Sequence, residues 1–255
     1  MSDKARHYLD VVTVLAQKDF KVRYRNSVLG FLWSLLNPLA YMVILTVVFS
    51  VLFHVTVQNY AASLLIGLLI WRFFSVGTNQ GLGSIVSNPS LVTKVYVPRY
   101  LIVLSNNLAN FFGATLEFVV LFPLLILLGV HLSLYLLLLP ILLVVEFWLV
   151  FSLSLFLSSL NLKYRDFNQI WDIALQLGFY VSPIVYNSSL IVAKYHFYYI
   201  LNPVTGLIDW LRAMLLSNQL PDPFETSVLL LVTFLFFILG WSIFRKIERR
   251  FAEEL

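Results

Sequence analysis

The sequence predicts an all-α polytopic membrane protein with six transmembrane helices. Of its 255 residues, 60% are hydrophobic and 12% are charged, whereas soluble domains are close to half apolar and a quarter charged. The apolar residues gather in long blocks, and a bilayer-spanning helix needs about 20 such residues. Residues 18–25 carry four Lys or Arg side chains directly before the first block. Such a junction is typical of the cytoplasmic side of a membrane protein.

Six segments are long and apolar enough to cross a bilayer. They are residues 29–55, 61–82, 101–129, 134–160, 167–186 and 227–244. The first contains Asn37-Pro38, which predicts a kink near its start. The fifth begins with polar side chains that include Asp172 and Gln176. Because lipid disfavours such groups, we expect this face of the fifth span to contact protein or water.

The basic residues predict the orientation of the spans. Of the 17 Lys and Arg residues, 14 lie in the N-terminal segment, in the second and fourth connections between spans, or at the C-terminus. The first and third connections carry none, and the long fifth connection carries Lys194 and Arg212. Since cytoplasmic loops are rich in Lys and Arg, both termini are predicted to be cytoplasmic.

Three segments outside the spans are predicted to form shorter helices. Residues 1–28 place apolar side chains on one helical face and polar ones on the other, which is typical of a helix on the inner membrane surface. Asn88-Pro89 predicts the start of a short cytoplasmic helix within residues 84–99. Residues 187–226 hold two apolar stretches around Asn202-Pro203 that are too short to span, which predicts a re-entrant or interfacial hairpin on the outer side. Residues 245–255 form a cytoplasmic tail.

Three ionisable residues lie inside the predicted spans, namely Arg72, Glu117 and Glu146. At a rise of about 1.5 Å per residue, each lies roughly 16–18 Å from the outer end of its span. Pairing would offset much of the cost of removing these charges from water. We therefore expect Arg72 to bridge one or both glutamates across the second, third and fourth spans. A structural role is favoured over a transport role.

Several kinds of catalytic and binding motif are not found in the sequence. It has no cysteine, which rules out a disulfide framework, a zinc ribbon and a thiol nucleophile. It has no G-x-x-x-x-G-K-[ST] motif for cradling nucleotide phosphates. The histidines are scattered, so no metal site is predicted. The membrane explains the net charge of +4 better than nucleic acid does, and the sequence predicts neither catalytic residues nor an enzyme.

Four blocks of sequence resemble the transmembrane (permease) subunit of ABC-type polysaccharide exporters, which move O-antigen, capsule or teichoic acid. The blocks are KDFKVRYRNSVLGFLWSLLNPL at 18–39, NPSLVTKVYVPR at 88–99, LNLKYRDFNQI at 160–170, and SPIVY with LNPVTGLIDWLRAMLL at 182–216. They occur in family order and cover nearly the whole chain. The resemblance implies a single permease domain over 1–255 that works as a homodimer with two separate ATP-binding-cassette ATPase subunits.

The resemblance also implies roles for particular residues. Segment 84–99 would be the coupling helix loop that contacts the ATPase, with the candidate residues Asn88, Leu91, Lys94, Pro98 and Arg99. The first and fifth spans would line the pathway, with the aromatic candidates Trp33, Tyr41, Phe49, Phe179 and Tyr180. Such rings can stack on sugars but are equally ordinary facing lipid. The hairpin 187–226 would form an outer gate, with the candidates Asn202, Pro203 and Arg212.

The substrate implied by the resemblance is a lipid-linked polysaccharide, whose pyrophosphate needs cationic partners at the inner leaflet. The basic candidates for this role are Arg23, Arg25, Lys163 and Arg165. Binding of lipid headgroups, or topology alone, would explain them equally well. The resemblance further implies that the chain binds no cofactor, that ATP and Mg are used by the partner subunit, and that the protein lies in the bacterial inner membrane.

Other functions remain open from the sequence. A drug or bacteriocin ABC exporter permease would share the six spans but would not be expected to show the first and third blocks so fully. A secondary transporter would need coupling charges and two similar halves, and no internal repeat is visible. A membrane-embedded glycan transferase would need a cluster of carboxylates or a metal site facing a cleft.

Overall fold

Helices make up the described part of the chain, and five of them are long and apolar enough to cross a membrane. The structure is a computed structural model that describes residues 3–25, 29–52, 59–94, 97–130, 134–188, 191–248 and 251. The five are α2 (Leu32–Thr46, continued by a π-helix at Val47–Leu52), α3 (Tyr60–Gly83), α5 (Tyr100–Leu127), α6 (Leu139–Lys163, preceded by a 3-10 turn at Leu134–Leu138) and α10 (Pro223–Ile247). These helices correspond to five of the six predicted spans.

The sixth predicted span, residues 167–186, corresponds to a shorter helix. α7 covers Phe167–Val181, which is 15 residues. At about 1.5 Å per residue this is roughly 22 Å, less than the approximately 30 Å of a bilayer core. The helix ends where Ser182 adopts an extended conformation before Pro183. The count of six spans therefore stays a prediction.

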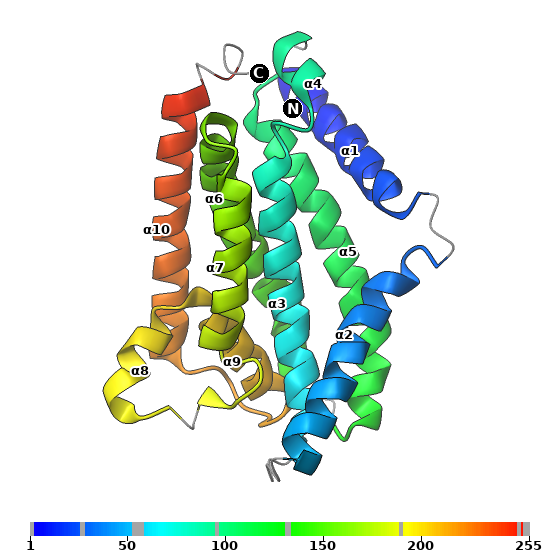
Figure 1. Ribbon diagram of the computed structural model, residues 1–255, viewed down its shortest axis with the longest axis vertical. Helices are drawn as coiled ribbons and strands as arrows, with labels where there is room; N and C mark the ends of the chain where they lie inside the picture. Colours follow the sequence, from blue (N-terminus) through cyan, green and yellow to red (C-terminus); the bar gives the residue numbers. More distant parts are fainter. Residues whose placement is uncertain are drawn as a thin grey trace.

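The long helices run side by side, with α3 in the middle of the bundle (Figure 1). α6 packs against both α3 and α10, and α7 lies beside α3 and α6. Both chain ends lie at one end of the bundle, together with α1 (Asp3–Tyr24) and α4 (Pro89–Lys94) (Figure 1). We call this the termini end. α8 (Ala193–Ile200) and α9 (Pro203–Leu215) lie at the opposite end.

Small residues allow the central helices to approach closely. A side-chain carbon added at Gly81 of α3 would lie 2.4 Å from Cβ of Ser154 in α6. One added at Gly240 of α10 would lie 2.3 Å from the backbone oxygen of Ser152. In lipid, helix association depends on this kind of close contact because the hydrophobic effect does not drive it.

Proline-containing turns set the starts of the short and final helices. Asn88 precedes α4, and its backbone oxygen accepts from the backbone nitrogen of Leu91 at 3.1 Å. At the opposite end, Asn202 Oδ1 accepts from the backbone nitrogen of Val204 at 3.1 Å, directly before α9. Asp222 caps α10 in the same way. Each cap satisfies a backbone N–H that has no partner within its helix.

Candidate functional site

A polar cavity of about 300 Å³ lies between the ends of α1 and α2 and the helices α3 and α5. We call it the arginine cavity, and its polar lining residues are Arg23, Ser34, Asn37, Arg72, Gln80, Asn110 and Glu117. Arg72 Nε on α3 donates to Glu117 Oε2 on α5 at 2.8 Å. The sequence predicted a bridge of this kind from the matching depths of the two residues. The pair joins two helices and leaves the rest of the Arg72 guanidinium beside the cavity.

Arg23, a candidate for binding lipid headgroups or pyrophosphate at the inner leaflet, also lines this cavity. α1 packs along α5, and from its last turn the side chain of Arg23 reaches α3. There, an Nη atom of Arg23 donates to Gln80 Oε1. Within the described residues, Arg23 Nε is buried and has no hydrogen-bond partner. The side chains of Arg23 and Arg72 therefore both line the arginine cavity.

A second cavity, of about 520 Å³, adjoins the first, and four aromatic rings lie among the apolar and polar side chains that line it. We call it the aromatic cavity, and its aromatic residues are Tyr41 from α2, Trp71 from α3, and Phe179 and Tyr180 from α7. Asn37, Arg72 and Val76 line both cavities. The two cavities thus form one stretch of surface that changes from cationic to aromatic along α2 and α3.

Four of the five aromatic pathway candidates lie at these cavities. Trp33 lines the arginine cavity, while Tyr41, Phe179 and Tyr180 line the aromatic one. Tyr180 is 74% exposed. Phe49 lies elsewhere, with its ring centroid 6.4 Å from that of Tyr60. The exposed rings of Trp33, Tyr41 and Tyr180 are available to a sugar face or a lipid chain.

Glu146 does not join the ion pair. It is fully buried, and within the described residues neither of its carboxylate oxygens has a hydrogen-bond partner. Arg72 therefore bridges one of the two glutamates, Glu117, as the hypothesis allowed, and the inclusion of Glu146 in the charge network is wrong. Depth along a helix was predictable, but the direction in which each side chain leaves its helix was not.

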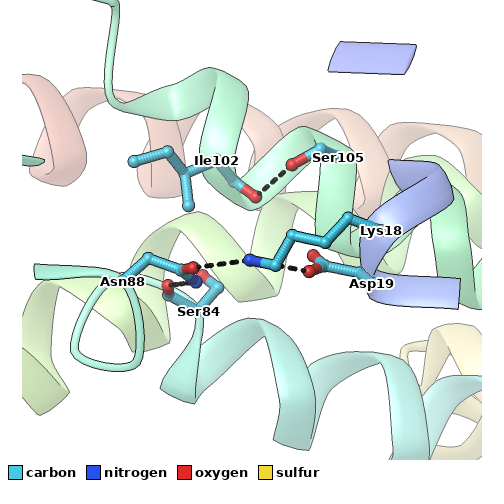
Figure 2. Close-up of polar contacts among 6 residues, drawn as sticks. All are labelled: Lys18, Asp19, Ser84, Asn88, Ile102 and Ser105. Carbon is cyan, nitrogen blue, oxygen red and sulfur yellow. Dashed lines mark hydrogen bonds and ion pairs between the residues drawn. The ribbon is translucent and has the colours of Figure 1, made fainter. Parts of the chain in front are cut away.

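At the termini end, polar contacts hold α1 against the start of α4. Figure 2 shows Lys18 of α1 reaching to Asn88, where Nζ donates to Oδ1 at 3.1 Å. Asn88 Nδ2 in turn donates to the backbone oxygen of Ser84 at 2.9 Å, and Lys18 also pairs with Asp19 at 3.5 Å. One side chain of α1 therefore contacts the residue that directly precedes α4.

An apolar groove of about 350 Å³ lies beside these contacts. We call it the α1–α4 groove, and its residues are His7, Asp10, Val11, Val14, Leu15, Leu91, Val97 and Ile102. Of the coupling candidates whose side chains the structure describes, Leu91 alone lines this groove. Pro98 precedes α5, and Arg99 Nη1 donates to the backbone oxygen of Glu248 at 2.7 Å. The side chain of Lys94 lies outside the described residues.

Three of the four basic candidates for binding headgroups or pyrophosphate lie outside the arginine cavity. Arg25 is exposed just after α1. Lys163 and Arg165 are exposed at the end of α6, where Lys163 Nζ lies 5.1 Å from the centroid of the Tyr164 ring. Of these four candidates, therefore, only Arg23 lines the arginine cavity in the described structure.

At the opposite end, Arg212 fastens α9 to its neighbours. Its guanidinium donates to the backbone oxygens of Ser63 at 3.1 Å, Pro183 at 2.6 Å, Ile184 at 3.0 Å and Tyr186 at 3.3 Å. Burial lowers the pKa of Arg212 to about 10, so the group stays charged at neutral pH. Asn202 adds a contact from Nδ2 to Ser182 Oγ at 3.0 Å. Pro203 occupies the first turn of α9.

Asp209 lies one turn before Arg212 on α9. Burial raises the pKa of its carboxyl to about 6, although a hydrogen bond from Ser188 Oγ at 2.9 Å and the charge of Arg212 both favour ionisation. The ordinary value is about 3.9. Because the folded-state pKa is the higher one, ionised Asp209 opposes folding above pH 6. This penalty declines as the pH falls from about 6 to about 4.

We therefore expect Asp209→Asn to raise the thermal midpoint of unfolding by several degrees at pH 8, with a gain that shrinks toward zero by about pH 4. Unfolding of the purified protein followed by tryptophan fluorescence across this range would measure the gap between variant and wild type. Asp10→Asn, at an exposed position, serves as the control and should show no such narrowing. If the difference in thermal midpoint between Asp209→Asn and the wild type grew as the pH fell, the raised pKa of Asp209 would be contradicted.

Comparison with known proteins identifies the family. Residues 10–216 match the ABC-2 type transporter family. The chain belongs to this family. It is 32% identical over 98% of its length to the O-antigen export system permease protein RfbA of Klebsiella pneumoniae, covering 96% of that protein.

Two further relatives are also similar to this chain over nearly its whole length. The chain is 29% identical over 97% of its length to RfbA of Myxococcus xanthus, covering 96% of that protein. It is 22% identical over 93% to the polysialic acid transport protein KpsM of Escherichia coli, covering 93% of it. These relatives and the long apolar helices identify this chain as a multi-pass membrane permease, a transport subunit rather than an enzyme.

Three polar residues that complete the arginine cavity were not predicted from the sequence. Asn37, Gln80 and Asn110 lie within or beside predicted spans, where single amides do not stand out. Gln80 lies eight residues after Arg72, so the two are about two helical turns apart on nearly the same face of α3. This spacing, together with the positions of Arg23 and Arg72, was the feature of the sequence from which Gln80 could have been predicted to lie in the cavity.

Proposed function

We propose that this ABC-2 permease moves a lipid-linked polysaccharide across the bacterial inner membrane. Two copies of the chain would work with two separate ATPase subunits on the cytoplasmic side. The observation that carries the proposal is the continuous surface along α2, α3 and α7, where the arginine cavity passes into the aromatic cavity. A guanidinium suits an anionic group, and exposed aromatic rings suit sugar faces. Full-length relatives named for O-antigen and polysialic acid transport support the substrate class.

Six crossings with cytoplasmic termini fit this function. α7 would act as the remaining crossing despite its 15 residues, because the turn after it and the α8–α9 hairpin would extend it to the outer surface. Both chain ends and the basic α1 lie at the termini end (Figure 1), which supports a cytoplasmic position for that end. The hairpin of α8 and α9 would then be the outer gate.

Dimerisation is supported by the exposed apolar side of α7. Ile173, Leu177 and Tyr180 are exposed on this helix at helical spacing, next to the aromatic cavity. A second copy facing this side would enclose the surface as a pathway between two permease chains. ATP binding would close the ATPase subunits and shift the permease population through differential affinity for its two states.

The ATPase is expected to dock at the α1–α4 groove. The groove is apolar and lies at the termini end, and its lining comes from α1, from the predicted coupling helix α4 and from the start of α5. The hydrogen bond between Lys18 and Asn88 also connects α1 to the residue before α4. A push on α4 would therefore reach α1, and from there the Arg23 end of the arginine cavity. ATP and Mg would be bound by the partner and not by this chain.

The test is copurification of the tagged permease with a coexpressed ABC ATPase, followed by mass measurement of the complex. We expect two permease and two ATPase chains, with ATP hydrolysis that depends on the permease. Val14→Asp, in the groove and 64% exposed, should reduce copurification at least tenfold. Leu220→Asp, 61% exposed at the opposite end, should leave it unchanged.

A permease that binds no ATPase, or that binds one equally well with Val14→Asp, would refute this docking surface. A drug or bacteriocin exporter permease is the alternative within the superfamily. It would copurify with its ATPase but would not restore surface polysaccharide in a strain lacking its own exporter.

A further inference from the structure

We infer that the C-terminal turn of the chain positions the coupling helix α4. The C-terminal turn consists of Glu248 and Phe251, the described residues that follow α10. The inference rests on the proposed function, in which residues 84–99 meet the ATPase. It gives Arg99 a contact inside the permease instead of a contact with that partner. Movement of α4 would then pass into α10 as well as into α1.

Phe251 is buried in a small apolar core at the termini end. Phe251 and Phe244 of α10 are both fully buried, and their ring centroids lie 5.3 Å apart with the rings almost perpendicular. Val92 of α4 is 4% exposed and belongs to the same apolar cluster, which is separate from the main core between the spans. We call it the α4 cluster, and its buried members are Ile85, Val92, Ile102, Val103, Phe151, Leu155, Leu162, Phe244 and Phe251. The C-terminal turn and α4 therefore share one core.

Hydrogen bonds connect the C-terminal turn to the segment that follows α4. The backbone nitrogen of Arg99, directly before α5, donates to Glu248 Oε1 at 3.3 Å. In the other direction, Arg99 Nη1 donates to the backbone oxygen of Glu248 at 2.7 Å, and this oxygen also accepts from the backbone nitrogen of Phe251 at 3.3 Å. The first N–H groups and the last carbonyls of a helix lack partners within it, so a carboxylate suits its start and a guanidinium its end. Glu248 therefore stabilises the start of α5, and Arg99 stabilises the end of α10.

α4 depends on such contacts for its position. It has six residues, and isolated helices shorter than about 12–15 residues are marginal in water. Before the helix, Lys18 of α1 donates to Asn88. Within the helix, Val92 is buried in the α4 cluster, and after it, Arg99 is held by Glu248. The C-terminal turn takes part in the last two of these contacts.

α10 connects the C-terminal turn to the spans. It packs along α6, which packs against α3 in the middle of the bundle. At Gly240 the backbones of α10 and α6 lie so close that an added side-chain carbon would be 2.3 Å from the backbone oxygen of Ser152. Close-packed interfaces of this kind transmit strain. A displacement of α4 by the ATPase would therefore reach α10, α6 and the pathway helix α3.

Hydrogen exchange of the purified full-length permease tests the packing. We expect Phe251→Ala to speed exchange of the backbone amides of residues 91–93 at least tenfold, because α4 loses part of the core that holds it. Phe118→Ala, a matched truncation of a buried ring in the main core, should lower the thermal midpoint of unfolding but leave exchange in α4 unchanged. Unchanged exchange in Phe251→Ala, or equal acceleration by both variants, would overturn the inference.

The complex with the coexpressed ABC ATPase tests the role in coupling. We expect the Phe251→Ala permease to copurify with the ATPase and to hydrolyse ATP within twofold of the wild type, yet to export at least fivefold less surface polysaccharide. The reason is that closure of the ATPase would move a loosened α4 without moving α10. A tenfold loss of copurification would instead make the C-terminal turn a contact of the ATPase, and export that falls only in proportion to hydrolysis would also overturn the inference.

Two variants of Glu248 provide an independent arm if Phe251→Ala does not fold. Glu248→Ala should show the same loss of export with retained hydrolysis, because the backbone nitrogen of Arg99 loses its acceptor. Glu248→Gln should export like the wild type, because its amide oxygen can still accept from that nitrogen. Equal export by the two variants would overturn the inference.

These outcomes are separate from those of the proposed function. A permease that copurifies with its ATPase and restores surface polysaccharide, with normal export by Phe251→Ala and Glu248→Ala, keeps its function and loses this role of the C-terminal turn. A permease in which Phe251→Ala frees α4, but which binds no ATPase, keeps the packing of the C-terminal turn and loses the proposed function.

Discussion

Arg212→Met is expected to lower the free energy of unfolding by on the order of 3–5 kcal/mol, the largest effect of any substitution considered for this permease. The side chain is 6% exposed, and its guanidinium donates to the backbone oxygens of four residues. Methionine fills much of the space but donates to none of them, so buried carbonyl groups lose their partners. Thermal unfolding of the purified protein, followed by tryptophan fluorescence, would measure the loss.

Two further variants distinguish the contribution of the guanidinium geometry to stability from the contribution of its positive charge. Arg212→Lys should recover only part of the stability, because one ammonium group cannot reach carbonyls that the planar guanidinium contacts on several sides. Arg245→Met removes an exposed arginine that is paired with Glu248 at 3.5 Å and should cost less than about 1 kcal/mol. If Arg212→Met and Arg245→Met had equal effects, the backbone contacts would not be stabilising α9.

The contacts of Arg212 also have a mechanical consequence. The carbonyls that it holds belong to α3 and to the turn that follows α7. The proposed outer gate is therefore attached to the end of a proposed pathway helix. A displacement of α7 during transport would be transmitted to α9 instead of being absorbed in a loose loop.

The long helices were predictable from the sequence because each is marked by its own composition. Blocks of apolar residues placed α3, α5, α6 and α10 to within a few residues, and proline-containing turns such as Asn202-Pro203 placed the starts of shorter helices. α7 was predicted as five residues longer at its end. Residues 182–186 are apolar enough to continue the span, but Pro183 and the contacts of Arg212 hold them in a turn.

The candidate site was predictable only in part. Equal depth in the membrane correctly suggested that Arg72 meets Glu117. The position of Arg23 depended on α1 packing along α5, which is a tertiary contact between segments about 90 residues apart. No local pattern specifies such a contact. Arg23 was therefore grouped with Arg25, although the structure places the two side chains in different surroundings.

The two buried glutamates should respond in opposite directions to the same substitution. Glu117 accepts from Arg72 at 2.8 Å, so Glu117→Met leaves a partly buried guanidinium without its partner. We expect this change to destabilise the permease by about 3 kcal/mol. Glu146 is fully buried with no hydrogen-bond partner for either oxygen among the described residues. Glu146→Met removes a group whose burial is costly and replaces it with an apolar chain of similar length.

Glu146→Met is therefore expected to be neutral or to raise stability by about 1–2 kcal/mol. Thermal midpoints of the two single variants, measured in the same detergent, would test the contrast. Adding Arg72→Met to Glu117→Met should recover part of the lost stability, because the unpaired charge is then gone. Adding Arg72→Met to Glu146→Met should instead lower stability, because Glu117 then loses its partner. A loss of stability in Glu146→Met comparable to that in Glu117→Met would mean that Glu146 has a partner in the assembled protein.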